Sequence, residues 1–270
     1  MFNDLFQRNR FPFLILFSLG VLTSCSNTAQ ENPEPYSTLI WEDNFEQDGS
    51  ISMENWSYET GRGNNGWGNG ESQYYTARPE NIVVEEGLLK IHARREDYQG
   101  ARYTSARIKS QGLFQFTYGK VEVRAKLPSG RGVWPAIWML GRNFTSVGWP
   151  RCGEIDIMEY SGNRPGQISA AIHNASSYGN TQNTQTKSVE NETSEFHVYS
   201  IEWDAEMIRF FVDGERFYVY SPYPKTPENW PFDANQFLIL NVAMGGSYGG
   251  SIDPNFQHGT LEVDYVRVYQ

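Results

Sequence analysis

Basic residues are scarce in this 270-residue chain, and they are not clustered. Its 22 Lys and Arg residues are outnumbered by 32 Asp and Glu residues, which gives a formal net charge of −10. Nucleic acids and anionic membranes bind proteins through concentrated positive charge. We therefore predict no nucleic-acid partner and no membrane contact through the folded surface of the protein.

Long apolar runs are also missing. The mostly hydrophobic stretch from Phe11 to Ser24 follows Arg8 and Arg10. It is shorter than the roughly 20 residues that a membrane-spanning helix needs, but it suits the apolar part of an export signal. The stretch is therefore interpreted as part of a signal peptide and not as a transmembrane helix.

A cysteine follows this stretch directly. The residues Leu22-Thr23-Ser24-Cys25 resemble a bacterial lipobox, in which the cysteine becomes the lipidated first residue of the mature chain. We predict a lipoprotein signal peptide over residues 1–24, lipidation at Cys25 and a flexible tether over residues 25–36. The protein is then exported and held at the outer membrane, facing the periplasm or the cell surface, and it touches the membrane only through this anchor. The alternative is an ordinary signal peptide with an incidental cysteine.

Cysteine is otherwise nearly absent, since Cys152 is the only other one in the chain. If Cys25 carries lipid, Cys152 has no partner for a disulfide. An exported domain must then be stabilised by its hydrophobic core, and residues 37–270 are long enough to form one. No signature of a catalytic cysteine surrounds Cys152, so we do not expect it to act as a nucleophile.

Strand signals recur along the rest of the chain, whereas helix signals do not. The sequence from Lys120 to Leu127 alternates apolar and charged residues with the period of a half-buried strand. Asp213-Gly214 lies between aromatic and β-branched residues and predicts a hairpin. Phe237 to Met244 is nearly continuously apolar, as in a strand covered on both faces. Many short strands predict an all-β fold, a β-sandwich or jelly roll of two antiparallel sheets.

Glycine and aromatic residues are abundant. The 25 glycines include two rich stretches, residues 61–70 and 245–250, which predict loops. Loops on a rigid scaffold are where binding sites are usually built. The 16 Tyr, 16 Phe and 8 Trp residues exceed what such a chain ordinarily carries, and they favour a flat, uncharged ligand.

Three acidic residues lie within a run of Ile and Met from Gly153 to Tyr160, GEIDIMEY. On a regular strand Glu154 and Asp156 face one side and Glu159 the other, because successive side chains alternate. A β-bulge at about Ile157-Met158 places all three on one face and keeps a carboxylate out of the apolar layer. The bulge leaves the two glutamate carboxyls about 5 to 6 Å apart, near the separation found in retaining glycosidases.

Carboxylates this close do not all ionise, so at least one pKa must rise. A protonated Glu159 then donates to the leaving glycosidic oxygen while Glu154 attacks the anomeric carbon, and Glu159 later serves as base for the incoming water. Asp156 lies between them and keeps Glu154 oriented. The alternatives for this strand are a solvated acidic face and a metal site.

With these residues the chain resembles glycoside hydrolase family 16, and within it the bacterial laminarinases, over about Leu39 to Gln270. GEIDIMEY matches the family's E-x-D-x-x-E signature in the Met-containing, bulged form that is typical of laminarinases. Other matching stretches are Trp41-Glu42-Asp43 with Phe45, Trp67 to Tyr75, Tyr103 to Arg107, Trp134 to Leu140, and Phe196-His197 with Glu202-Trp203. The resemblance implies a β-jelly roll with a concave face forming an open cleft, retention of configuration and endo-cleavage of β-1,3-glucan. It also implies a monomer that needs no cofactor for catalysis.

The resemblance assigns Glu154 as nucleophile, Glu159 as acid/base and Asp156 as helper. The residues that it places against glucose units on the non-reducing side are Asn69, Arg107, Trp134 and Trp138, and it places His173 near the cleavage point. An indole face matches the apolar face of a glucose ring, and Asn and Arg donate directional hydrogen bonds to hydroxyls. The alternatives are sandwich core for the tryptophans, a surface ion pair for the arginine and a structural role for the histidine.

Family members often hold a structural calcium on the convex face. The positions that match its ligands are Glu46, the carbonyl of Gly87, and Asp264. Oxygen donors suit calcium. The alternative for Asp264 is a plain exposed strand face, since it alternates with Glu262.

One stretch departs from many relatives, because Asn174 and Ala175 replace the Thr-Pro that follows the histidine there. His173 is kept, so we expect the chemistry to be intact and the +1 side of the cleft to differ. Alternatives to β-1,3-glucanase activity are cleavage of mixed-linkage β-1,3-1,4-glucan or of a marine galactan. A different class is a non-catalytic β-glucan-binding protein, but such proteins typically lack the catalytic glutamates that are present here.

Overall fold

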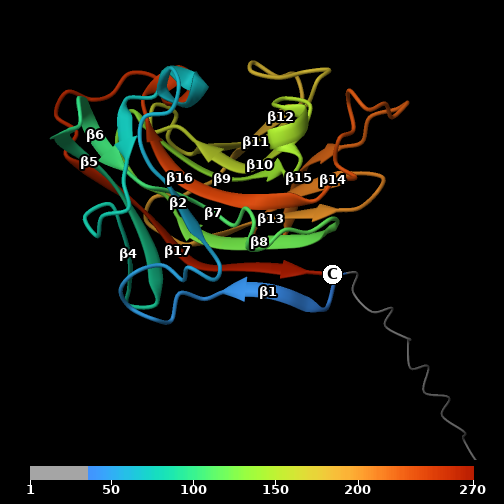
Figure 1. Ribbon diagram of the computed structural model, residues 1–270, viewed down its shortest axis with the longest axis horizontal. Coiled ribbons are helices and arrows are strands. Elements are labelled where there is room, and N and C mark those ends of the chain that lie inside the picture. The colour runs from blue at the N-terminus through green and yellow to red at the C-terminus, as the bar shows by residue number, and fades with distance from the viewer. Residues whose placement is uncertain (1–35) are drawn as a thin grey trace, which may run out of the picture. The chain divides into compact units, whose positions relative to one another are not determined.

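The computed structural model describes residues 36–270, which form two stacked β-sheets (Figure 1). The predicted signal peptide, the lipidation site Cys25 and nearly all of the tether lie outside the described residues. Within residues 36–270, no helix has the length and apolar character needed to cross a membrane.

One sheet has ten strands, and all its pairings are antiparallel except that of β3 with β6. Its strands are β1 (Leu39–Asp43), β3 (Gln73–Tyr75), β4 (Ile82–Glu85), β5 (Leu88–Tyr98), β6 (Ala101–Ser105), β8 (Gly119–Lys126), β13 (His197–Trp203), β14 (Ile208–Val212), β15 (Glu215–Tyr220) and β17 (His258–Tyr269). The order is β15-β14-β13-β8-β17-β5-β6-β3, with β1 also pairing with β17 and β4 with β5.

The other sheet has seven antiparallel strands in the order β12-β11-β10-β9-β16-β7-β2. Its strands are β2 (Ser57–Glu59), β7 (Arg107–Lys109), β9 (Val133–Gly141), β10 (Glu154–Tyr160), β11 (Gln167–His173), β12 (Thr184–Ser188) and β16 (Gln236–Met244). Figure 1 shows this sheet curved, with its outer face on the inside of the curve. The prediction of a jelly-roll sandwich of two sheets is confirmed.

The core lies between the sheets, and the sequence pattern explains which faces are buried. Along β8 the partly buried and fully buried residues alternate strictly, with Val121, Val123 and Ala125 inside. Every residue of β16 is buried, as predicted for a strand covered on both faces. One of its faces joins the central core, while Phe237 and Ile239 join a second, smaller cluster with Cys152 on the outer face of the sheet.

The predicted hairpin is also present. Asp213 and Gly214 connect β14 to β15, and both have positive φ angles (50° and 77°), as the tight two-residue turn requires. The two glycine-rich stretches differ from simple loops, because each contains one short turn. These turns are η1 (Gly66–Gly70) and α2 (Gly246–Gly249), and a third, α1 (Phe144–Val147), lies between β9 and β10.

The glycines let two of these turns meet at the edge of the seven-stranded sheet. A side chain on Gly246 would come within 2.9 Å of the Asn69 carbonyl and 3.3 Å of the Trp134 ring. Glu71, just after η1, also bridges to Gly245. The sequence that follows β16 therefore holds the η1 turn against the outer face of the sheet, beside the predicted sugar-binding residues.

Candidate active site

The acidic strand β10 contains the predicted β-bulge. Asp156 pairs with Ala171 and Glu159 with Ser169, so two residues of β10 lie opposite one residue of β11. On the other side, Asp156 pairs with Trp138 and Met158 with Ile137, which identifies Ile157 as the extra residue. Because of this insertion Glu159 changes parity and joins the face of Glu154 and Asp156.

The two faces of β10 have opposite chemistry. Ile155, Ile157, Met158 and Tyr160 are buried in the core between the sheets. The three carboxylates therefore project from the outer face of the seven-stranded sheet, where Asp156 is only 4% exposed. An acidic strand face bathed in solvent does not fit this burial.

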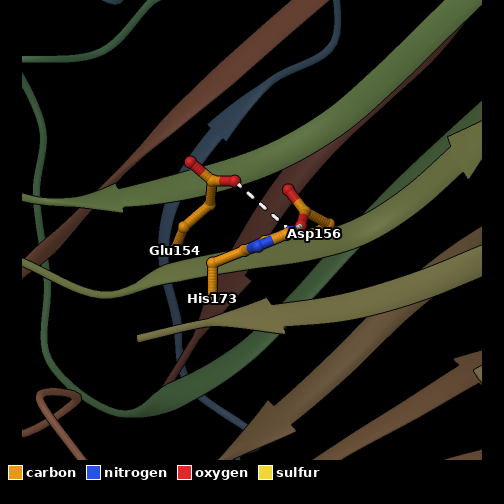
Figure 2. Close-up of side chains that lie close together, drawn as sticks. All are labelled: Glu154, Asp156 and His173. Carbon is orange, nitrogen blue, oxygen red and sulfur yellow. Dashed lines mark ion pairs between the residues drawn. The ribbon is translucent and has the colours of Figure 1, made fainter. Parts of the chain in front are cut away.

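His173 reaches toward two of the carboxylates from the neighbouring strand β11 (Figure 2). Its Nε2 atom lies 3.2 Å from Asp156 Oδ2 and 3.7 Å from Glu154 Oε1. The backbone N–H of Gly179 donates a hydrogen bond to His173 Nδ1, so in the neutral ring the proton is on Nε2. Nε2 therefore faces the carboxylates as a donor.

This tautomer bears on the alternative of a metal site. Among the described residues, Glu154, Asp156 and His173 form the one group of acidic, Cys or His side chains whose ligand atoms lie close enough to share an ion, within 4.8 Å. A ring nitrogen that carries a proton has no lone pair for a metal. The arrangement suits a histidine that orients carboxylates better than one that ligates a cation.

Glu159 has a different partner, the indole of Trp134. Trp134 Nε1 donates a 2.9 Å hydrogen bond to Glu159 Oε1. The Trp134 ring is 9% exposed and packs against Tyr248, with ring centroids 5.4 Å apart. The hydroxyl of Tyr248 lies 2.6 Å from Ser169 Oγ, on the residue that pairs with Glu159. These contacts fix the orientation of the Glu159 carboxyl.

Burial raises the pKa of all three carboxyl groups, and repulsion between like charges adds to the rise for the two glutamates. For Glu154 and Glu159 burial is the larger cause, and the charge of Asp156 is the next. The pKa of Glu154 and that of Glu159 each rise to about 8, and for Glu159 the hydrogen bond from Trp134 opposes the change. Because the groups interact, one can ionise while another keeps its proton. Burial alone raises the pKa of Asp156. A carboxyl group that keeps its proton near neutral pH can serve as a general acid.

Arg107 and Trp138 lie together farther along the same sheet face. The Arg107 guanidinium is stacked between two indoles, 4.7 Å from the Trp67 ring centroid and 4.8 Å from that of Trp138. It also forms a 2.6 Å ion pair with Glu59. The ion pair that was considered as an alternative for Arg107 is therefore present, and it is part of the aromatic group.

A buried hydrogen-bond network that the sequence did not predict lies beneath these residues. Glu71 is 6% exposed and accepts hydrogen bonds from Asn69, Gln73 and Tyr75. The Tyr75 hydroxyl accepts one from Asn241, whose Oδ1 accepts the indole N–H of Trp138 at 2.8 Å. Burial raises the pKa of Glu71 as well. The available signal was Asn241, a lone amide within the apolar sequence of β16.

The stretch that departs from relatives has a structural explanation. Asn174 is fully buried. Its Oδ1 accepts hydrogen bonds from the backbone and hydroxyl of Ser176 and from the backbone of Ser177. Its Nδ2 donates to the Tyr220 hydroxyl and to the Asn229 carbonyl. Asn174 therefore organises the loop that follows β11.

Cys152 is fully buried, and burial raises the pKa of its thiol to about 12. A thiol that stays protonated is a poor nucleophile. The expectation that Cys152 is not catalytic fits this environment. Among the described residues it is the one cysteine, and it is unpaired.

The three positions implied for calcium lie in the ten-stranded sheet. β5 pairs with β17 up to Val263 and β1 pairs with it from Val266, both on the edge opposite β8. Asp264, the extra residue of a bulge, lies in the gap between them. Gly87 directly precedes β5, and Glu46 follows β1 by a few residues, so the pairings bring all three positions toward this gap.

The chemistry of these positions fits a calcium ion. Asp264 Oδ2 forms a 2.5 Å ion pair with Arg124, and Oδ1 would be the atom available to an ion. Glu46 is exposed and adds a second carboxylate. Two carboxylates and a backbone carbonyl are oxygen donors of the kind that calcium prefers.

A β-jelly roll whose concave face bears paired glutamates and stacked aromatic rings defines a glycosidase of extended carbohydrate chains. Residues 69–267 match the family described as glycosyl hydrolases family 16, and the chain belongs to this family.

Individual relatives agree with this assignment. The chain is 44% identical over 269 residues to a beta-glucanase from Rhodothermus marinus. The aligned region covers 94% of this chain and 93% of the relative. The crystal structure of a laminarinase from Flavobacterium superposes with a TM-score of 0.82 at 43% identity, covering 86% of this chain and 100% of that one. A non-specific endo-beta-1,3(4)-glucanase of the same family gives a TM-score of 0.81 at 41% identity, covering 88% and 92%.

Proposed function

We propose that this protein is a retaining endo-β-1,3-glucanase that cleaves laminarin-type glucan by double displacement. The observation that carries the proposal is the bulge in β10, which brings Glu154, Asp156 and Glu159 to one face. The similarity to a laminarinase supports the choice of substrate. No cofactor takes part in the chemistry that these residues perform.

In the first step, protonated Glu159 gives its proton to the glycosidic oxygen of the leaving sugar. The carboxylate of Glu154 attacks the anomeric carbon, so the glycosidic C–O bond breaks and a glycosyl ester forms. The raised pKa of Glu159 keeps its proton available near neutral pH. Asp156 and the Nε2–H of His173, both close to Glu154, hold the nucleophile in position.

In the second step the Glu154 charge is neutralised in the ester. Loss of a nearby negative charge favours the ionised form of Glu159, so its carboxylate can accept a proton from the incoming water. The water oxygen bonds to the anomeric carbon and Glu154 leaves as a carboxylate. Two inversions give net retention of configuration.

The sugar chain on the non-reducing side lies over β9, β16 and β7 in this proposal. Trp134 and Trp138 present ring faces to glucose, and Arg107 and Asn69 donate hydrogen bonds to its hydroxyls. The Trp134 indole N–H already donates a hydrogen bond to Glu159, so the same side chain contacts both the acid and the sugar in this proposal. The Arg107–Trp67–Trp138 stack gives this side an aromatic surface.

Mixed-linkage β-1,3-1,4-glucan is the second candidate substrate, because one similar structure is that of a non-specific endo-beta-1,3(4)-glucanase. The test incubates the full chain, in mild detergent, with laminarin, lichenan, agarose and carrageenan, and follows product size and reducing ends. We expect rapid endo-cleavage of laminarin. Cleavage of a galactan with laminarin untouched would overturn the proposal.

The nucleophile can be tested separately. Glu154→Ser removes the attacking carboxylate, so hydrolysis should be lost while glucan binding, measured by affinity electrophoresis, persists. An active Glu154→Ser variant would remove Glu154 from the nucleophile role. A wild-type chain that binds laminarin without cutting it would instead indicate the non-catalytic binding protein.

We propose two further features that carry no step of the reaction. Glu46, the Gly87 carbonyl and Asp264 hold a structural calcium ion. The chain is also an exported outer-membrane lipoprotein, anchored through Cys25 and facing the periplasm or the cell surface. Mass spectrometry of the membrane fraction tests the anchor, since an N-terminus without acyl chains at Cys25 would contradict it.

A further inference from the structure

The order of strands divides the catalytic face into two sides. β10, with the catalytic acids, lies between β9 and β11. Trp134, Trp138, Asn241 and Arg107 all lie on the β9 side, on β9, β16 and β7. An endo-acting enzyme holds sugar units on both sides of the bond that it cleaves. The units beyond the cleaved bond must therefore lie over β11 and the loops next to it.

Two exposed aromatic residues lie on this second side. Trp149 is 42% exposed, more than any other tryptophan within residues 36–270, and Tyr178 is 54% exposed. Their ring centroids are 5.4 Å apart at an interplanar angle of 82°. The Trp149 ring centroid lies 6.1 Å from that of His173, whose Nε2 atom faces the carboxylates. The pair is therefore continuous with the catalytic centre.

The two rings come from different loops, and both loops are held in place. Trp149 lies between α1 and β10. In this loop the Cys152 and Gly153 backbone N–H groups donate to carbonyls of the loop, and the Gly148 N–H donates to a carbonyl of α1. Tyr178 lies in the loop after β11 that Asn174 organises, and the next residue, Gly179, donates to His173 Nδ1. A surface that is ordered before binding loses little entropy when it meets a ligand.

Two large exposed rings in contact form an apolar patch of the kind that often marks a binding site. Packing in the core does not account for these two rings, since neither residue belongs to the hydrophobic clusters of the sandwich. Aromatic rings stack on the apolar face of a β-linked glucose unit, and the Trp N–H and Tyr O–H bond its hydroxyls. A glucose unit is uncharged, so a site that binds it needs no charged side chain, and neither Trp149 nor Tyr178 is charged.

We propose that Trp149 and Tyr178 form the acceptor subsite, which binds the glucosyl units on the reducing-end side of the cleaved bond. This inference rests on the proposed glucanase function and adds a specific binding surface to it. During hydrolysis the subsite holds the leaving part of the chain. After that part departs, the subsite can bind a second saccharide while the glycosyl ester on Glu154 still exists.

The same subsite then influences what resolves the ester. Glu159 takes the proton from a hydroxyl of the bound saccharide, and the hydroxyl oxygen forms the new glycosidic bond to the anomeric carbon. The ester bond to Glu154 breaks and its carboxylate is released. Transfer to sugar and hydrolysis thus differ only in whether the acceptor is a saccharide or water, and Trp149 and Tyr178 favour the saccharide.

The test compares two substrates in Trp149→Ala, Tyr178→Ala and a control, Phe196→Ala. Phe196 is a half-buried aromatic that packs under Arg124 and Lys126 of the other sheet. Laminarin uses the acceptor subsite, whereas 4-nitrophenyl β-laminaribioside has a leaving group that is not a sugar. We expect kcat/KM on laminarin, relative to the nitrophenyl substrate, to fall about 3- to 10-fold for each ring removed and to stay constant in the control.

A second readout is the share of transfer products when laminaribiose is added as acceptor, which should fall in both variants. An unchanged substrate ratio and an unchanged transfer share in both variants would overturn the inference. An equal loss on both substrates in Trp149→Ala, with Tyr178→Ala like wild type, would also overturn it, because Trp149 would then only support His173. A wild-type enzyme inactive on laminarin and lichenan would instead refute the glucanase function itself.

Discussion

At the scale of single residues, Asp156 affects the protonation of both glutamates. Its charge is the second cause, after burial, of the raised pKa of both Glu154 and Glu159. It does not touch the reacting atoms in the proposed mechanism, and it acts through its two neighbours. A carboxylate between an acid and a nucleophile therefore sets the pH range over which one is protonated and the other ionised.

Asp156→Asn should move the bell-shaped pH dependence of kcat/KM to lower pH. Removing the negative charge lowers the pKa of Glu159, so the acid loses its proton, and activity, at a lower pH. We expect the alkaline limb to shift by about one pH unit or more. Asp97→Asn, at an exposed position of β5, is the matched control. A profile that keeps both limbs in place would contradict this role for Asp156.

The raised pKa of Glu159 also has a consequence for stability. In the folded protein the carboxyl keeps its proton up to about pH 8, whereas in the unfolded chain it releases it near 4.5. Its contribution is fully present below about pH 4.5 and is lost as the pH rises to about 8. Glu159→Gln should therefore melt like wild type at pH 4 and about 10 °C higher at pH 8.5. Calorimetry at several pH values checks this, and equal melting temperatures throughout would refute it.

At the scale of elements, β16 connects the core to the proposed sugar-binding surface. One of its faces fills the centre of the sandwich, and on the other Asn241 links Trp138 to Tyr75 and so to Glu71. Glu71 in turn holds Asn69 of the η1 turn. The position of Asn69 and of the Trp138 ring thus depends on a carboxylate that is buried away from any substrate.

Glu71→Gln should weaken substrate binding more than it slows the reaction. The new amide can keep one acceptor for Gln73 and Tyr75, but its NH₂ group faces the donor on Asn69, so Asn69 loses its anchor. We expect KM for laminarin to rise about 5-fold or more, with a smaller change in kcat. Glu86→Gln, on the exposed turn between β4 and β5, should leave both constants at the wild-type values. A variant whose KM equals that of wild type would show that the network does not position Asn69.

At the scale of the whole molecule, the two sheets carry different tasks. The seven-stranded sheet carries the acids and the aromatic surface, and the ten-stranded sheet carries the gap in pairing at Asp264. The proposed calcium ion would connect the chain after β1, the turn before β5 and the bulge of β17. It would stabilise the fold and take no part in bond cleavage.

Removal of calcium with a chelator should therefore lower the melting temperature and leave the activity of the folded enzyme unchanged. Free calcium at 100 times its Kd contributes about 2.7 kcal/mol, which corresponds to roughly 5 to 10 °C for a domain of this size. Addition of calcium, but not of magnesium, should restore the melting temperature. In Asp264→Asn the melting temperature should respond to neither the chelator nor calcium. A chelator without effect on wild type would contradict the calcium proposal.

Several features followed from local sequence alone. Alternation of apolar and charged residues predicted β8, the Asp-Gly pair predicted the β14–β15 turn, and parity along GEIDIMEY predicted the bulge in β10. Each depends on neighbours within about ten residues, because strand geometry and turn conformation are set by adjacent side chains. The acids of the site and their common face were therefore predictable.

Other features were decided only by the tertiary structure, because they join residues far apart in the chain. Asn241 meets Tyr75 across 166 positions, and Trp138 across 103. The tautomer of His173 depends on a backbone N–H in a loop whose shape is set by Asn174. Strand pairing brings Trp149 and Tyr178 together from loops on two different strands. The sequence by itself determined which acids share one face of β10, and the pairing of distant strands decided what holds them and which surfaces lie on either side of the proposed cleavage point.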